Sequence, residues 1–171
     1  MAGVGLMLSS CLIEDPPPYT EPQQTPPRLD LRRAVPLIDQ IIVRARGESV
    51  PFNVPVASED AGDDLLAFLL LNYTGESSGA PILASARVPA STLDDTDRVI
   101  ALDWSIDSRV SRGCQRLTLQ VSHVSNMDFD HLPLVFDKSD LAIAVWWANI
   151  DLGAGSSAML TDCPLATGGG Q

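Results

Sequence analysis

Apolar and polar side chains alternate along several short stretches from about residue 35 onward. In each of the stretches 49–58, 98–107 and 115–124, the side chains at every second position form one mainly apolar row and so share a face. Those shared faces are Val50, Phe52, Val54 and Val56; then Ile100, Leu102, Trp104 and Ile106; then Leu117, Leu119, Val121 and His123. A period of two predicts strands with one buried face. Pro51 and Pro55 cannot donate ladder hydrogen bonds, so we expect the first of these strands at a sheet edge.

Two further stretches, 65–73 and 141–150, are apolar at consecutive positions, as strands covered on both faces would be. The stretches 37–46 and 80–88 predict two shorter strands. Segments rich in Gly, Asp and Ser separate all these runs, and no run has helical periodicity. The pattern predicts an all-β fold, an antiparallel β-sandwich of seven or eight strands over residues 35–165, with a disordered tail at 166–171.

The segment FNVPVASEDAGDDLLAFLLLNY, from Phe52 to Tyr73, resembles the start of an immunoglobulin-like or cadherin-like repeat. It reads as a strand, an acidic glycine turn and an apolar strand. The resemblance implies immunoglobulin-like topology. The chain departs from the antibody pattern, in which a Trp lies between two bridged cysteines, because Trp104 precedes Cys114 here. Membership of the antibody family is therefore not implied.

The N-terminal stretch GLMLSSC resembles a bacterial lipobox, with Leu8, Ser9 and Ser10 before Cys11. In that family a signal peptidase cuts before the cysteine, which then carries the lipid. Residues 1–10 would be the remnant of a signal peptide, although they contain no Lys or Arg and are shorter than a full one. Position 12 is Leu and not Asp, which by resemblance points to the outer membrane.

The segment that follows Cys11 is rich in proline, with prolines at 16, 17, 18, 22, 26 and 27. Such a segment favours an extended, polyproline-like spacer. We expect residues 11–34 to be a lipid-anchored linker that holds the sandwich away from a membrane.

Two cysteines remain if Cys11 is lipidated. Exported proteins meet an oxidising compartment, so we expect Cys114 and Cys163 to form a disulfide. Their separation matches no CxxC redox or zinc signature. The bridge would hold the last segment of the chain against the strand that begins near Cys114.

Charge excludes one class of partner. Acidic residues outnumber basic ones by 22 to 11, which gives a net charge of −11 and an isoelectric point near 4.3. This field repels a polyanion, so we expect no nucleic-acid binding.

Acidic and histidine side chains raise two metal hypotheses. His123 and His131 bracket Asp128 and Asp130, but their spacing matches no zinc motif, and a satisfied strand histidine beside a solvated loop explains them as well. Calcium is the other hypothesis, since it takes six to eight oxygen ligands, often from several loops. Its candidate ligands are Glu59, Asp60, Asp63, Asp64, Asp128 and Asp130. The alternative is that these acids are ordinary solvated turn residues.

Signals for catalysis are weak. The chain has no GxSxG elbow, and neither histidine lies in a recognisable triad context. A pair of carboxylates suited to glycoside hydrolysis cannot be identified without distances. The sequence therefore predicts a protein that is not an enzyme, with a hydrolase or a metal-dependent enzyme as the alternative.

Trp146 and Trp147 are adjacent on a predicted strand, so they point to opposite faces. Leu141, Ile143 and Val145 would join Trp147 on the bulkier face, which we assign to the core. Trp146 would then lie on a shallow alanine face, as a contact site for a sugar or a protein partner. The alternative is that the segment LRRAVPLI, residues 31–38, covers it.

Together these observations predict a lipid-anchored protein of the bacterial cell envelope. Its membrane contact would be the lipid, and its sandwich would bind or assemble with a protein or glycan partner. An envelope hydrolase or metal-dependent enzyme, and a structural subunit of an outer-membrane complex, stay open as alternatives.

Overall fold

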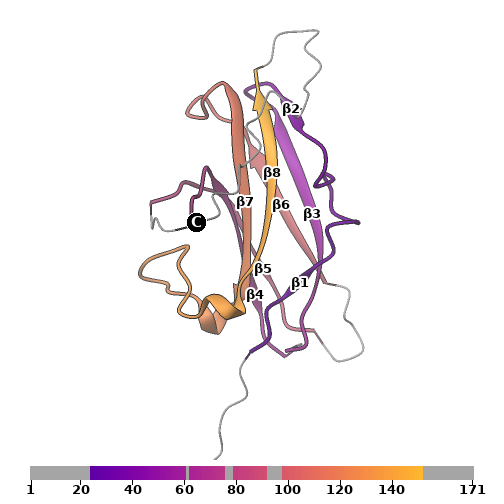
Figure 1. Cartoon of the computed structure of the whole chain (residues 1–171), viewed down its shortest axis with the longest axis vertical. Helices are drawn as coiled ribbons and strands as arrows, with labels where there is room; N and C mark the ends of the chain where they lie inside the picture. Colours follow the sequence, from indigo (N-terminus) through magenta and orange to yellow (C-terminus); the bar gives the residue numbers. More distant parts are fainter. Residues whose placement is uncertain (1–23, 61, 76–78, 92–97, 152–171) are drawn as a thin grey trace, which may run out of the picture.

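A computed structural model describes residues 24–60, 62–75, 79–91 and 98–151 of the chain as two packed β-sheets (Figure 1). Among these residues there are eight strands: β1 (Arg28–Leu29), β2 (Ile42–Arg44), β3 (Ser49–Ala57), β4 (Leu65–Leu71), β5 (Ile82–Val88), β6 (Arg98–Ser105), β7 (Gly113–His123) and β8 (Ala142–Ile150). The described helices are two 3₁₀ turns, η1 (Val124–Asn126) and η2 (Lys138–Asp140), and neither could cross a membrane. The all-β sandwich is confirmed.

The strand order is that of an immunoglobulin-like sandwich. One sheet has the order β1-β3-β6 and the other β2-β8-β7-β4-β5. Lettered along the chain as A, A′, B, C, C′, E, F and G, these strands form an A-B-E sheet and an A′-G-F-C-C′ sheet. All pairs are antiparallel except β2–β8, in which Ile42 to Arg44 run parallel to Ala148 to Ile150. The sequence analysis did not anticipate this parallel pair.

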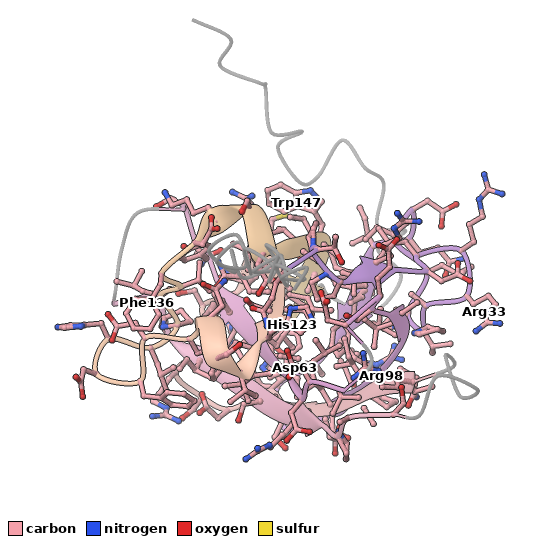
Figure 2. All side chains as sticks on the ribbon, turned by 90° about the horizontal axis from the view of Figure 1, so that it is seen from below. Arg33, Asp63, Arg98, His123, Phe136 and Trp147 are labelled. Carbon is pink, nitrogen blue, oxygen red and sulfur yellow. The ribbon has the colours of Figure 1, made fainter. Side chains whose placement is uncertain are left out.

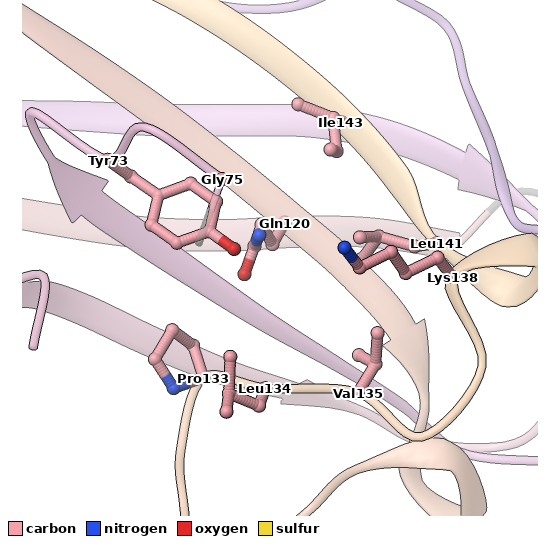
Figure 3. Close-up of a pocket in the computed structure, with 9 residues that line it drawn as sticks. All are labelled: Tyr73, Gly75, Gln120, Pro133, Leu134, Val135, Lys138, Leu141 and Ile143. Atoms are coloured by element: carbon pink, nitrogen blue, oxygen red, sulfur yellow. The ribbon is translucent and has the colours of Figure 1, made fainter. Parts of the chain in front are cut away.

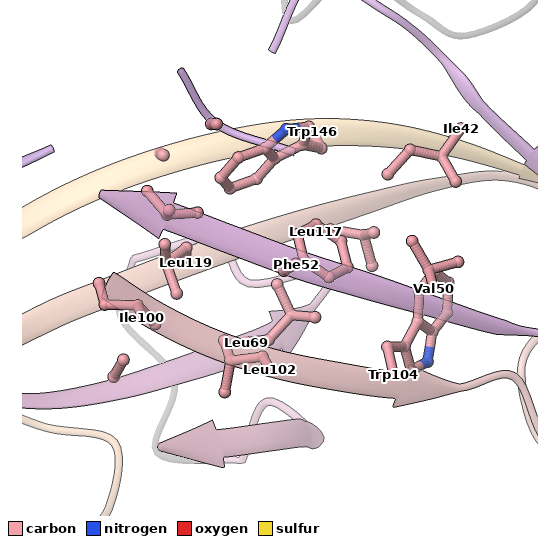
Figure 4. Packing of buried hydrophobic residues seen from close by; sticks show 14 of the residues in the cluster. Ile42, Val50, Phe52, Leu69, Ile100, Leu102, Trp104, Leu117, Leu119 and Trp146 are labelled. Carbon is pink, nitrogen blue, oxygen red and sulfur yellow. The ribbon is translucent and has the colours of Figure 1, made fainter. Parts of the chain in front are cut away.

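The alternating strands bury their apolar rows as predicted, and β3 and β6 are neighbours in the three-stranded sheet. The inward row of β3 (Val50, Phe52, Val54, Val56) and the inward row of β6 (Ile100, Leu102, Trp104) are buried. Figure 4 shows these side chains packed between the sheets against Leu69, Leu117 and Leu119 of the opposite sheet. Apolar burial on this scale is the main favourable term in folding.

The prediction that β3 lies at a sheet edge is wrong, because β3 runs between β1 and β6. The two prolines still lie where their missing N–H groups cost no ladder hydrogen bond. Strand β1 pairs with only two residues of β3, and Asn53 instead exchanges hydrogen bonds with Val35. Pro51 and Pro55 stand two residues to either side of Asn53, so their nitrogens face this irregular side and not the ladder to β6.

Strand β4 is covered on both faces, as its continuous apolar sequence predicts. Ala67 and Leu69 belong to the main core between the sheets. Phe68 and Leu70 belong to a second cluster on the outer face of the five-stranded sheet, together with Tyr73 and Met127. The segment between β7 and β8 therefore covers part of the sheet that would otherwise face solvent.

Strand β7 differs from the half-buried pattern expected of it. Its outward row includes Thr118, Gln120 and Ser122, which are 1%, 3% and 1% exposed. Both faces of this strand are thus buried. Polar groups in such a place need hydrogen-bond partners.

The two tryptophans of β8 have the opposite orientation to the predicted one. Trp146 is fully buried and Trp147 lies half-buried on the outer face. The Trp146 ring packs edge-to-face on Phe52, and its Nε1–H donates to the carbonyl of Pro36 at 3.0 Å (Figure 4). The small neighbours Ala144 and Ala148 leave room for the ring. Trp146 is therefore a core residue and not a contact site, and the alternative of cover by residues 31–38 holds at Pro36.

Candidate functional site

His123, at the end of β7, joins three segments that are distant in sequence. Its side chain is fully buried. Nδ1 lies 2.7 Å from Oδ1 of Asp140, and Nε2 lies 2.8 Å from Oγ of Ser58. In the tautomer with a proton on Nδ1, the ring donates to the Asp140 carboxylate and Nε2 accepts from the Ser58 hydroxyl. Figure 2 shows His123 in the interior of the molecule.

Asp140 is held by further hydrogen bonds at the end of η2. Its Oδ2 accepts from Ser122 Oγ at 3.0 Å and from the His123 backbone N–H at 3.3 Å. Asn126 extends this network, since its Nδ2 donates to Ser122 Oγ at 2.9 Å and to the Asp137 carbonyl at 2.7 Å. A buried carboxylate is tolerated only with such partners. The network fixes both ends of the segment between β7 and β8.

The order Ser58–His123–Asp140 is that of a nucleophile, a base and an orienting acid. Nothing in the sequence around His123 indicates this series, because its three members come from segments distant in the chain. Among the described residues, the groups next to Ser58 are not arranged to stabilise an oxyanion. The backbone N–H of Asp60 donates to Ser58 Oγ at 3.1 Å, so it points at the nucleophile and not at a developing oxyanion. The acids Glu59 and Asp60 also follow Ser58 directly, and their charge opposes an oxyanion.

The predicted calcium ligands do not converge. Among the described residues there is no group of three or more His, Cys, Asp or Glu side chains placed to hold a metal. The acids instead bind separate protein partners: Glu59 pairs with Arg28, Asp60 accepts from Thr25, Asp63 accepts from Gln24, and Asp64 accepts from Arg87 and the Ala90 N–H. The Ala90 and Arg87 hydrogen bonds lower the pKa of Asp64. These carboxylates are ion-pair and turn residues here.

Asp128 and Asp130 lie in the segment between β7 and β8, on a different loop from Glu59 to Asp64. Asp128 bonds His131 Nδ1 at 2.9 Å and accepts from the Asp130 backbone N–H at 3.1 Å. The hydrogen bond from His131 is the largest cause of the lowered pKa of Asp128. His131 therefore stabilises an exposed turn, while His123 is buried. The hydrogen bonds described for the two histidines are to different residues.

Of the predicted covalent sites, Cys11 and Cys163 lie outside the described residues. Cys114 is described, near the start of β7, and is disulfide-bonded. It belongs to the outward row of β7, which continues through Arg116, Thr118 and Gln120. Its pairing with Cys163, and the lipidation of Cys11, stay predictions.

A cleft of about 490 Å³ opens on the outer face of the five-stranded sheet (Figure 3). Most of its lining is apolar, and the lining comprises Tyr73, Gly75, Gln120, Pro133, Leu134, Val135, Lys138, Leu141 and Ile143. The segment after β7 forms one wall, and β8 with its preceding residues forms the other. Gln120 lies at the floor, where its register partners are Phe68 on β4 and Ile143 on β8.

Ile143 lines this cleft, and two exposed phenylalanines lie on the segment between β7 and β8 that supplies other lining residues. Phe136 is 73% exposed, Phe129 is 60% exposed and Ile143 is 50% exposed. Figure 2 shows Phe136 at one side of the molecule, far from Arg33. Two phenylalanines in water are unusual in a loop that also contains three aspartates, 128, 130 and 137. We call the cleft with Phe129, Phe136 and Ile143 the apolar surface.

Sequence reasoning missed this surface and assigned partner contact to Trp146. One signal in the sequence could have indicated it. In MDFDHLPLVFD, Phe129 and Phe136 stand in an aspartate-rich loop with no strand periodicity to bury them. Gln120 and Lys138 carry no such signal, because their placement depends on the path of the loop.

Comparison with known proteins finds matches among solved structures. No family model matches the chain, and no curated protein matches it. A solved structure that matches is the CARDB domain of a Pyrococcus furiosus protein, determined in complex with di-metal ions. The match has 12% sequence identity, a TM-score of 0.39, and covers 64% of this chain and 84% of that chain.

Proposed function

We propose that this chain is a lipid-anchored protein of the bacterial cell envelope, whose sandwich is a binding or assembly module for a protein partner. Cys11 would be the anchor and the proline-rich segment the spacer. The observation that carries the binding role is the apolar surface, above all the exposed rings of Phe129 and Phe136. Recognition would rest on surface complementarity and not on bond chemistry.

The loop that presents these rings is held in one conformation. The Asp128 N–H donates to the Leu134 carbonyl at 3.0 Å, and the Phe136 N–H donates to the Asn126 carbonyl at 3.0 Å. Asn126 Oδ1 in turn accepts from the Asp137 N–H at 2.8 Å. An ordered loop loses little conformational entropy when it binds. Phenylalanine is among the residues that are enriched in the cores of protein interfaces.

Lipidation is tested on the protein expressed from its native gene, with the upstream sequence included. We expect a membrane-bound product that begins at Cys11 and is heavier than the polypeptide by a diacylglycerol and an acyl chain. The variant Cys11→Ser should leave the protein unlipidated. A wild-type product that fractionates without membranes and has the bare polypeptide mass would overturn the anchor.

The binding surface is tested by placing a photoreactive phenylalanine analogue at position 136, and separately at Val99, in cells. Val99 is the matched control because it is 48% exposed and apolar, but lies on β6 of the other sheet. We expect a discrete cross-linked product from position 136 that is lost when Phe129 is changed to Ser. Equal cross-linking from both positions, or none from 136, would show that this surface does not select a partner. Reproducible cross-linking to a single outer-membrane protein would favour a structural subunit.

A hydrolase is the second candidate, favoured by the hydrogen-bonded series Ser58–His123–Asp140. A fluorophosphonate probe labels a serine only where a base activates it. Stoichiometric labelling of Ser58, abolished by His123→Gln, would favour the hydrolase. Absence of labelling in a folded protein would leave the three residues as a structural link.

A further inference from the structure

The cleft in the apolar surface contains a buried polar group that no part of the described chain satisfies. Gln120 is 3% exposed, and its Oε1 is one of seven buried side-chain atoms without a hydrogen-bond partner among the described residues. Figure 3 shows its amide at the centre of the lining residues. Buried carbonyl groups in native proteins are nearly always paired, and an exception needs an explanation. Because the oxygen itself is closed to solvent, a ligand that donates an N–H or O–H would supply the missing bond once the Gln120 amide turns its oxygen toward the cleft.

Apart from Gln120, the Tyr73 hydroxyl and Lys138, the side chains of the cleft are apolar. Pro133, Leu134 and Val135 form one wall, while Leu141 and Ile143 form the other. The volume of about 490 Å³ lies within the range of small-ligand sites. A glycan carries many hydroxyl groups, each of which would lose its water here without a replacement. The walls therefore favour an apolar ligand with few polar atoms.

Lys138 supplies a second polar contact at the rim. Its ammonium only donates hydrogen bonds, and no ion pair to it is found in the described part of the chain. The neighbouring acids are already bound: Asp137 accepts from the Ser139 N–H at 2.8 Å, and Asp140 is bonded to His123. A cationic ligand would be repelled by Lys138, and an anionic one by the net charge of −11. The site thus favours a neutral ligand with one donor and one acceptor.

We propose that this cleft binds a neutral, apolar peptide segment of the partner. One main-chain N–H would donate to Gln120 Oε1, and one main-chain carbonyl would accept from Lys138 Nζ. Apolar side chains would pack on the two walls. A peptide unit provides one donor and one acceptor, which matches the Gln120 oxygen and the Lys138 ammonium. This inference rests on the proposed binding role and names the chemistry of the partner.

The test is a titration of the full chain with N-acetyl-leucyl-valinamide, a neutral capped dipeptide, followed by NMR. We expect saturable shifts of the Gln120 side-chain amide and of the backbone amides of 133–141, with a dissociation constant on the order of millimolar. Gln120→Met should weaken binding about fivefold to tenfold. Lys138→Met should weaken it less, because its contact is nearer to solvent. Arg33→Met, on the other side of the molecule, is the matched control and should bind like wild type.

The Gln120→Met variant also separates a ligand role from a structural one. Methionine removes the unpaired polar atom at similar volume, so the free protein should melt at a higher temperature while it binds the dipeptide less tightly. A lower melting temperature would show that Gln120 has a structural partner, and unchanged affinity would show that its oxygen does not touch the ligand. Either result overturns the assignment.

Two further probes limit the class of ligand. The same dipeptide with a free carboxylate should bind no tighter than the capped form, and maltose should not bind. Tighter binding of either would replace the neutral peptide by an anionic or a glycan ligand. If position 136 cross-links a partner but the capped dipeptide does not bind, the apolar surface stands and the cleft assignment fails.

Discussion

Phe52 and Trp146 meet edge-to-face between the two sheets, with ring centroids 5.4 Å apart and ring planes at 81°. Phe52 comes from β3 of the three-stranded sheet and Trp146 from β8 of the five-stranded sheet. This pair connects the two layers of the sandwich at a point where both side chains are 1% exposed or less.

Truncation of Trp146 should therefore damage the fold. We expect Trp146→Ala to lower the free energy of unfolding by about 3–5 kcal/mol, since it leaves a cavity against Phe52 and orphans the Pro36 carbonyl. Trp147→Ala, on the half-buried outer face, is the control and should cost clearly less. Urea denaturation followed by circular dichroism measures both, and equal losses would contradict the assigned orientation of β8.

Asp140 should contribute to stability through His123 and Ser122. Asp140→Ala removes one member of a buried polar pair and leaves its partners unsatisfied, so we expect a loss of about 3–5 kcal/mol. Asp130→Ala changes an exposed acid on the same loop and should stay within about 0.5 kcal/mol of wild type. Similar denaturation midpoints for the two variants would show that the His123 network is not a structural link.

Acid should destabilise the protein through carboxylates whose pKa is lowered in the fold. The Ala90 N–H and the Arg87 side chain hold the pKa of Asp64 below its ordinary value near 3.8. A carboxylate whose pKa is lowered in the fold contributes stability that is complete above its ordinary, unfolded-state pKa. This stability is lost as the pH falls through the folded-state pKa. Asp64→Asn should flatten the decline of melting temperature below about pH 4. An unchanged decline would show that these hydrogen bonds do not persist in solution.

The predicted Cys114–Cys163 bridge should contribute to stability by closing a loop of about 50 residues. In the chain-entropy model such a loop is worth about 4 kcal/mol. We expect Cys163→Ser to lower the denaturation midpoint and to abolish the two-dalton mass deficit of the oxidised chain. A mass deficit that persists in Cys163→Ser would assign the partner of Cys114 to Cys11 and remove the lipid anchor.

The fold was predictable where one pattern determined one face. The rows Val50 to Val56 and Ile100 to Ile106 alternate cleanly, and both proved to be buried. The buried face of β8 was not predictable in this way. The face of Ile143 and Trp147 carries the larger side chains, which favoured its assignment to the core. The face of Ala144, Trp146 and Ala148 is the buried one, because the small alanines leave room for the Trp146 ring to pack on Phe52. Packing between the two sheets determines which face of such a strand is buried. The sequence of one strand does not carry this information.

The site was less predictable than the fold. Ser58, His123 and Asp140 lie in three segments, and their contact depends on how the ends of β3 and β7 meet η2. Gln120 has the sequence context of an ordinary solvated strand residue. Its burial arises only because the segment between β7 and β8 folds back over the sheet. Burial of a strand by a distant loop is a tertiary contact, and it leaves no periodic pattern in the strand's own sequence.

The prolines of β3 have a consequence for self-association. An exposed row of backbone N–H and C=O groups is a template for strand addition and aggregation. On the side of β3 that faces away from β6, Pro51 and Pro55 present no N–H, and Asn53 is already bonded to Val35. A foreign strand would find few donors along this side, and the carbonyls of Asn53 and Pro55 already accept from Val35 and Asp30. The sequence thus guards the weakly paired flank of its smaller sheet against addition of another chain.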